Sequence, residues 1–208
     1  MQTIGDDLAQ RLLKKNEGDA FDTLSYLCRE ILRNVIEHSY SDNMYYSAQY
    51  YPKKNMVEVV VADEGEGVLE GLNQNPKLIL TDDKDAIKFA ILPGMSGRSH
   101  KYMGRRSSGH IYANSGYGLF LTQRICSNAG NFLMISNSHG VSISGDRVEH
   151  LPHVCFRGTI VRLSIDLSKV DGIADMIETY RDLAEEIIQK NKKLEKISPS
   201  AASMMLRL

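Results

Sequence analysis

The chain has 208 residues and a mass of 23.3 kDa, which suits one domain, or one domain with an appendage. Its 42% hydrophobic and 25% charged residues are typical of a globular chain and exclude a disordered or fibrous one. Lys and Arg number 25 against 26 Asp and Glu, so the net charge of −1 gives no overall basic surface and disfavours nucleic acid as a partner.

The cysteines and the N-terminus indicate the compartment. Cys28, Cys126 and Cys155 lie far apart, each in an apolar run, and we expect buried thiols in a reducing compartment rather than a disulfide framework. Residues 1–10 contain no apolar signal region, and no stretch approaches the roughly 18 apolar residues that cross a bilayer. These features predict a cytoplasmic protein with no membrane partner.

A helix and a hairpin are the first elements that the sequence predicts. Apolar residues recur at helical spacing from Phe21 to Ser39 and indicate an amphipathic helix. Residues 45–51 are rich in aromatic residues and residues 56–62 are rich in valine, and the polar stretch 52–55 between them predicts a hairpin.

The segment 68–115 that follows contains one short predicted helix near 85–92 and then a stretch rich in Gly, Ser and Arg. A loop this long inside a compact domain is usually functional or disordered. Order returns with a helix from Leu119 to about Ser127.

The rest of the chain is predicted as strands and a final helix. Strands are expected at 132–136, 141–144 and 159–166, with Gly140 and Gly145 as turn signals, and a helix at 172–190. This order of elements predicts an α+β fold, a two-layer sandwich with helices on one face of a mixed, mostly antiparallel sheet.

Glu30 and Asn34 lie four residues apart on the first predicted helix, with His38 one turn further on. All three therefore project from one stripe of that helix. A carboxylate and a carboxamide on one stripe can hold a hydrated magnesium ion, because hard cations take oxygen ligands. A solvated helix face is the alternative interpretation, since Glu and Asn are common there.

Asp63 stands at the end of the valine-rich strand and is followed by Gly65 and Gly67. An aspartate can accept a hydrogen bond from an exocyclic amine, and the glycines let the backbone turn sharply beside a flat ligand. An ordinary glycine-rich turn is the alternative. The chain has neither a G-x-G-x-x-G nor a G-x-x-x-x-G-K-[ST] pattern, which disfavours two common nucleotide-binding folds.

Gly116 and Gly118 directly precede the helix that is expected from Leu119. Free backbone N–H groups at a helix N-terminus favour an anionic phosphate chain, although a turn without a ligand has the same pattern. Thr159 follows Gly158 and opens a strand, where its hydroxyl can reach a base edge or a water molecule beside it. A threonine in a strand is by itself unremarkable.

Each of these motifs is weak alone, but their order is specific: E-x-x-x-N, D-x-G-x-G, G-x-G-L and then G-T. In this order the sequence resembles the GHKL superfamily of ATP-binding domains, the Bergerat fold, which includes DNA gyrase, heat-shock chaperone ATPases, MutL and histidine kinases. The resemblance covers residues 21–167. The stretch from Glu30 to His38 is most similar to the pattern of bacterial anti-sigma-factor serine/threonine kinases.

The resemblance implies a site for ATP and Mg²⁺. Glu30 would be the catalytic residue, a general base for water or for a substrate hydroxyl, and Asn34 would coordinate the magnesium ion. The other nucleotide-binding residues would be Asp63 at the adenine amine, Gly65 and Gly67 around the adenine, Gly116, Gly118 and Leu119 at the phosphates, and Thr159 near the adenine.

The resemblance also implies a domain organisation. We expect an N-terminal extension at 1–20, an ATP-binding domain at 21–168 with a lid at 93–115, and a C-terminal helix and tail at 169–208. The whole segment between the two glycine motifs is longer than the compact lids of anti-sigma kinases. The sequence also shows no phosphoacceptor-histidine helix or transducer domain, which counts against a sensor histidine kinase and a topoisomerase or mismatch-repair subunit.

Two further patterns have plainer interpretations. The four tyrosines within 45–51 are expected to pack against the protein rather than to stack on bases, because the hairpin carries only two lysines. His150, His153 and Cys155 have a spacing seen in metal sites, but without a fourth ligand nearby a loop beside a strand explains them better.

Two functions stay open. One is an enzyme that hydrolyses ATP or transfers its γ-phosphate to a Ser or Thr of a phosphoacceptor protein, which the acid at Glu30 supports. The other is an ATP-gated switch with little turnover that binds a regulatory protein, which the amphipathic C-terminal helix and the Met-rich end, 204–208, support. That helix can equally pack on its own domain. A homodimer is compatible with both functions.

Overall fold

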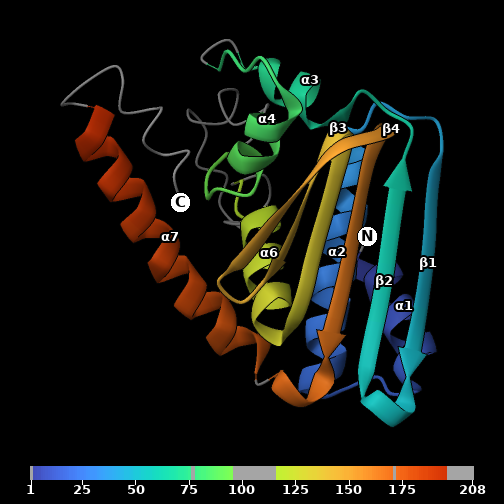
Figure 1. Ribbon diagram of the computed structural model, residues 1–208. Coiled ribbons are helices and arrows are strands. Elements are labelled where there is room, and N and C mark those ends of the chain that lie inside the picture. Colours follow the sequence, from blue (N-terminus) through green and yellow to red (C-terminus); the bar gives the residue numbers. More distant parts are fainter. Residues whose placement is uncertain (1, 76–77, 96–115, 171, 196–208) are drawn as a thin grey trace.

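The computed structural model describes residues 2–75, 78–95, 116–170 and 172–195. These residues form α-helices, short 3-10 helices and β-strands (Figure 1). In chain order the elements are α1 (Gln2–Leu13), α2 (Asp19–His38), β1 (Met44–Tyr51), η1 (Pro52–Lys54), β2 (Met56–Asp63), α3 (Gly67–Asn73), α4 (Asp83–Ala90), α6 (Gly118–Ala129), β3 (Gly130–Ser144), β4 (Arg147–Asp166), η2 (Leu167–Lys169) and α7 (Ile173–Glu195).

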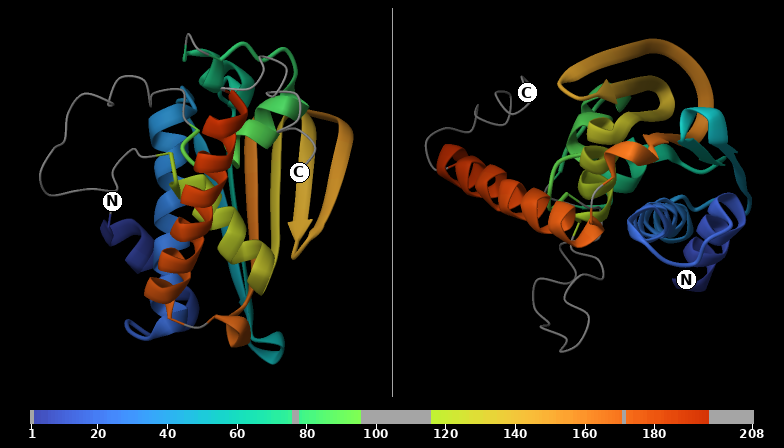
Figure 2. Two further views of the ribbon diagram at one scale, coloured as in Figure 1. Left: turned by 90° about the vertical axis from the view of Figure 1, so that its left-hand side faces the viewer. Right: turned by 90° about the horizontal axis from the view of Figure 1, so that it is seen from below.

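The strands form one sheet in the order β1-β2-β4-β3, and each of the three described pairings is antiparallel. Alternate residues of β2 are buried, so that Val57, Val59 and Val61 face the core. Residues of α2 and α6, among them Leu24 and Ile125, complete that core on the same face of the sheet (Figure 2). The expected α+β class and two-layer arrangement are therefore confirmed.

α2 forms where the apolar spacing predicts it, and its buried side includes Leu24, Leu27 and Ile31. The negative charges of Asp19 and Asp22 in its first turn interact favourably with the positive end of the helix dipole. α1, which the sequence pattern did not indicate, packs along α2 and contributes Ala9, fully buried, to the main core. Part of the segment assigned to an extension therefore packs with the domain.

The β1–β2 hairpin also forms as predicted, with η1 at its turn. Asn55 has a left-handed backbone (φ +49°), and its N–H donates to the Pro52 carbonyl oxygen at 3.2 Å. Tyr50 packs against the core, but Tyr45, Tyr46 and Tyr51 are exposed. Packing was the wrong expectation for these three. The register with β2 places Tyr45 and Tyr51 on the face of the sheet opposite the core, and Tyr46 stays exposed on the edge strand.

The β3–β4 hairpin differs most from the prediction. Residues 132–136 and 141–144 belong to one strand, β3, and Gly140 lies inside it, so the predicted turn there is wrong, whereas Gly145 does lie at the hairpin turn. The pairing register shifts around Asn137, where the long hairpin bends (Figure 1). The Asn131 amide then donates to Ser142 Oγ at 2.9 Å, which places the outer half of β3 beside its first half.

α3 and α4 form a small helical pair with its own apolar cluster at one end of the sheet. Leu72, Ala86 and Ala90 make their shared core, and Leu119 of α6 packs against it. The side chain of Asp83, at the start of α4, accepts hydrogen bonds from the backbone N–H and the hydroxyl of Ser138 at 3.1 and 2.6 Å. These bonds fix α4 to the bend of β3.

α7 packs on α6 through Ala184, which is fully buried, together with Tyr180 and Ile177 (Figure 2). No helix in the described ranges is long and apolar enough to cross a bilayer. Cys28 and Cys126 are buried as predicted. Cys155 is exposed, so the expectation of burial is wrong there, because it lies on the outer half of the bent hairpin.

Candidate functional site

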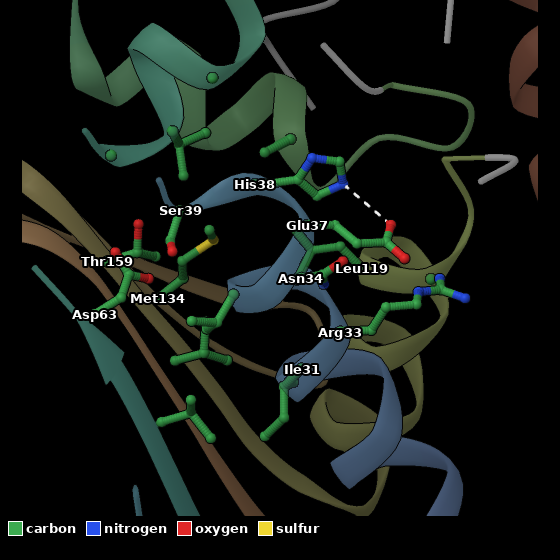
Figure 3. A pocket seen from close by; sticks show the side chains of 18 of the residues that line it. Ile31, Arg33, Asn34, Glu37, His38, Ser39, Asp63, Leu119, Met134 and Thr159 are labelled. Carbon is green, nitrogen blue, oxygen red and sulfur yellow. Dashed lines mark ion pairs between the residues drawn. The ribbon is translucent and has the colours of Figure 1, made fainter. Parts of the chain in front are cut away.

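A cavity of about 380 Å³ lies between the C-terminal half of α2 and the sheet, with α3, α4 and the start of α6 as its other walls (Figure 3). Of the nine predicted site residues, seven line it, and they come from four separate stretches of the sequence. These seven are Asn34, Asp63, Gly67, Gly116, Gly118, Leu119 and Thr159. Glu30 and Gly65 do not line the cavity.

Asp63 and Thr159 stand side by side at one end of the cavity, because the antiparallel register of β2 and β4 pairs them (Figure 3). The Asp63 side chain is buried, and its Oδ1 accepts the backbone N–H of Gly65 at 3.0 Å. Burial raises the pKa of Asp63, while hydrogen bonds from the backbone at Gly65 and Thr159 lower it. The arrangement presents a buried acceptor beside a hydroxyl, which suits a ligand with an N–H donor.

The turn after Asp63 passes very close to neighbouring backbone and side chains. A Cβ on Gly65 would run into the Ser39 carbonyl at the end of α2. Gly67 has φ +82°, and a Cβ there would come within 2.9 Å of the Asn137 Cγ. Asn137 in turn donates from Nδ2 to the Glu66 carbonyl oxygen at 3.2 Å. Glycine is therefore required at both positions, with Gly67 in the wall and Gly65 behind it.

Asn34 lines the cavity together with Glu37 and His38, which follow it by one helical turn (Figure 3). Glu37 Oε2 and His38 Nε2 are 3.9 Å apart. Sequence reasoning missed Glu37, although its position three residues after Asn34 on the same helix was a usable signal.

The oxygen donors of Asn34 and Glu37 fit a magnesium ion that arrives with a phosphate ligand. Among the described residues no group of three His, Cys, Asp or Glu side chains is placed to hold a metal. Magnesium commonly keeps several water ligands and takes phosphate oxygens, so that one or two protein oxygens suffice.

The first turn of α6 faces the cavity through Gly118 and Leu119. Backbone N–H groups in a first helical turn have no partner within the helix and carry partial positive charge. Gly116 just before it has φ +74°, a conformation that favours glycine. This end of the cavity therefore suits an anion.

The lid predicted at 93–115 falls largely outside the described residues, and the basic side chains expected there with it. Residues 93–95 at its start and Gly116 directly after it are described, and these two stretches meet at the cavity. The N–H of Gly94 donates to the carbonyl oxygen of Gly116 at 3.2 Å, and Met95 lines the cavity.

Glu30 is buried and paired with a cation. Its Oε2 lies 2.6 Å from Arg33 Nη2, and its Oε1 lies 4.0 Å from Arg29 Nε. Burial raises the pKa of Glu30, and the charges of Arg33 and Arg29 oppose that shift. The carboxylate also packs directly against Gly118, where a Cβ would collide with it. Glu30 is therefore adjacent to the cavity wall but held by Arg33, which itself lines the cavity.

A pair of histidines lies away from the cavity on the bent hairpin. His139 Nε2 and His150 Nδ1 are 3.1 Å apart. Burial is the largest cause that lowers the pKa of each, followed for His139 by His150 and for His150 by Lys84.

Comparison with known proteins gives no match: no family model matches the chain, and no curated protein is significantly similar to it.

Proposed function

We propose that the chain binds Mg-ATP in this cavity and belongs to the GHKL type of nucleotide-binding domain. One observation carries the proposal: four motifs that are far apart in the sequence line a single cavity, in positions that suit the two ends of a nucleotide. The volume of about 380 Å³ lies within the range of about 300–1,000 Å³ that is usual for small-molecule sites.

In this proposal the adenine amine donates to the buried carboxylate of Asp63, with Thr159 beside it. The phosphates lie against the N–H groups of the first turn of α6, at Gly118. Asn34 is the protein ligand of the magnesium ion, which offsets the charge of the triphosphate when it is bound.

As an enzyme, the protein would use Glu30 as a general base. The carboxylate accepts the proton of a water molecule or of a Ser or Thr hydroxyl on a phosphoacceptor protein. The deprotonated oxygen bonds to the γ-phosphorus, and the bond from that phosphorus to the bridging oxygen breaks, so that ADP leaves. General-base assistance of this kind contributes about 10²–10⁴ in rate.

A second function, an ATP-gated switch that binds a regulatory protein, is favoured by the state of Glu30. Its carboxylate is buried and paired with Arg33, which leaves the base occupied. ADP formation from ATP by the wild-type protein, measured with and without candidate partner proteins, separates the two functions, because hydrolysis and phosphotransfer both leave ADP: formation above the buffer blank supports the enzyme, and its absence supports the switch.

Calorimetry with ATP and GTP tests nucleotide binding itself. Guanine presents a carbonyl oxygen where adenine has its amine, so two acceptors would face each other at Asp63. An unsatisfied buried polar group costs about 1–3 kcal/mol, and we expect ATP to bind about 5-fold to 150-fold more tightly than GTP.

The variant Asp63→Ala is expected to lose that preference together with most of its ATP affinity. Glu64→Gln is the matched control, because Glu64 is the exposed neighbour and does not line the cavity. Equal affinity of the wild type for ATP and GTP, or unchanged ATP affinity in Asp63→Ala, would contradict the proposed adenine site.

A further inference from the structure

Arg33 lies between the Glu30 carboxylate and the cavity in which the phosphates are proposed to bind. On one side its Nη2 is 2.6 Å from the Glu30 carboxylate. On the other it borders the cavity at the start of α6, where a Cβ on Gly118 would lie 3.0 Å from the same nitrogen. Figure 3 places Arg33 on the side of the cavity away from Asp63 and Thr159, where the adenine is proposed to bind.

The guanidinium group of Arg33 is only partly satisfied. Its Nε is buried and has no hydrogen-bond partner among the described residues. Buried donors without partners are rare in folded proteins, because each costs about 1–3 kcal/mol. A planar group that has an unused donor, and whose Nη2 lies both on Glu30 and next to the cavity-lining Gly118, can bind a second anionic ligand.

We propose that Arg33 is the residue through which the terminal phosphate of the bound nucleotide releases Glu30. This inference rests on the proposed function. Without nucleotide, Arg33 pairs with Glu30 and keeps its carboxylate occupied. With ATP, the guanidinium turns to the γ-phosphate, and Glu30 is left free to accept a proton. Arg33 is thus a phosphate-contacting and positioning residue, and Glu30 is active only when a triphosphate is present.

The transfer of Arg33 from Glu30 to the γ-phosphate is favourable because the two anions differ in charge and in the number of guanidinium N–H groups that they can accept. A triphosphate carries several negative charges, whereas Glu30 carries one, and phosphate oxygens can accept two parallel N–H donors of one guanidinium. ADP has no γ-phosphate and so gives Arg33 no such partner. The pair therefore makes the protein sensitive to ATP as distinct from ADP.

Calorimetry of ATP and ADP binding, with magnesium present, tests this role. We expect Arg33→Gln to weaken ATP binding by about 10-fold to 100-fold, the value of a charge-assisted hydrogen bond, and ADP binding by less than about threefold. Arg33→Lys keeps the charge without the planar fork and is expected to recover part of the ATP affinity. Arg29→Gln is the matched control, because Arg29 also lies near Glu30 but does not line the cavity.

Glu30→Gln tests the competition directly. If Arg33 must leave Glu30 to reach the phosphate, removing the carboxylate charge tightens ATP binding by about threefold or more, and this gain disappears in Glu30→Gln/Arg33→Gln. The double variant also replaces the partly buried ion pair by a neutral pair. It therefore reports the contribution of Arg33 even where Arg33→Gln alone fails to fold.

The outcomes separate the two proposals. A wild-type protein that binds neither ATP nor ADP overturns the proposed function, and this inference with it. A wild type that binds ATP, with variants at position 33 that weaken ATP and ADP equally or not at all, leaves the proposed function standing and overturns the role of Arg33.

Discussion

Gly118 is a position where the structure predicts a large effect from adding one methyl group. Its backbone lies against the pair formed by buried Glu30 and half-buried Arg33, and an added Cβ would collide with the Glu30 carboxylate and lie 3.0 Å from Arg33 Nη2. The Glu30 carboxylate is buried and is held by Arg33 at 2.6 Å, so it has little room to move away from the added group. Overpacking of this kind costs about 1–3 kcal/mol, so Gly118→Ala is expected to lower the free energy of unfolding by that amount.

Urea denaturation followed by circular dichroism measures this cost. Each kcal/mol corresponds to about 2–4 °C in the melting temperature of a chain of this size, which a thermal scan resolves. Gly71→Ala is the matched control. Among the described residues, a Cβ there meets only the His38 carbonyl oxygen, at 4.0 Å, and Gly71 lies inside α3, so the change is expected to stabilise by up to about 1 kcal/mol.

The reasoning is tested further in the background of Glu30→Ala, where the colliding carboxylate is absent. We expect the cost of Gly118→Ala to fall by about 1 kcal/mol or more in that background, the coupling that is usual for residues in contact. An equal cost in both backgrounds, or a Gly118→Ala protein as stable as Gly71→Ala, would show that Gly118 is not required by its contact with Glu30.

Two more predictions follow from burial and charge. A thiol reagent should modify the exposed Cys155 quickly in the native protein, and should reach the buried Cys28 and Cys126 only on unfolding. Rapid labelling of all three thiols in the native state would contradict the burial of Cys28 and Cys126. The pKa values of His139 and His150 are lowered from 6.5, so the folded state binds fewer protons than the unfolded state just below that pH. Stability should therefore fall as pH drops from 7 through this range, and His139→Gln should make the fall shallower; an unchanged slope in chemical denaturation would refute the assignment.

The sequence predicted those elements whose signals are local. Apolar spacing located α2, and the polar stretch after Tyr51 located the β1–β2 turn, because side-chain periodicity and turn chemistry act over a few residues. The motifs at Asn34, Asp63 and Gly118 were found in the same way. Their meeting in one cavity was a prediction from the resemblance, which the placement of these residues supports.

Only the tertiary structure decided which distant groups touch. The pairing of Asp63 with Thr159 depends on the register between β2 and β4. The sequence of either strand alone does not specify that register. The bend of β3 at Asn137 left Cys155 exposed, and the edge position of β1 left Tyr46 exposed, although both have the composition of buried segments.

The pairing of Glu30 with Arg33 shows the same division between sequence and structure. Their spacing on α2 permits an ion pair, but on an open helix face such a pair is weak and screened. In the fold, α6 begins against it at Gly118, which covers the carboxylate and places the guanidinium next to a residue of the cavity wall. Sequence determined which charges share a helix turn, and tertiary packing determined their burial, because the energy of a charge depends on how much water the rest of the chain removes around it.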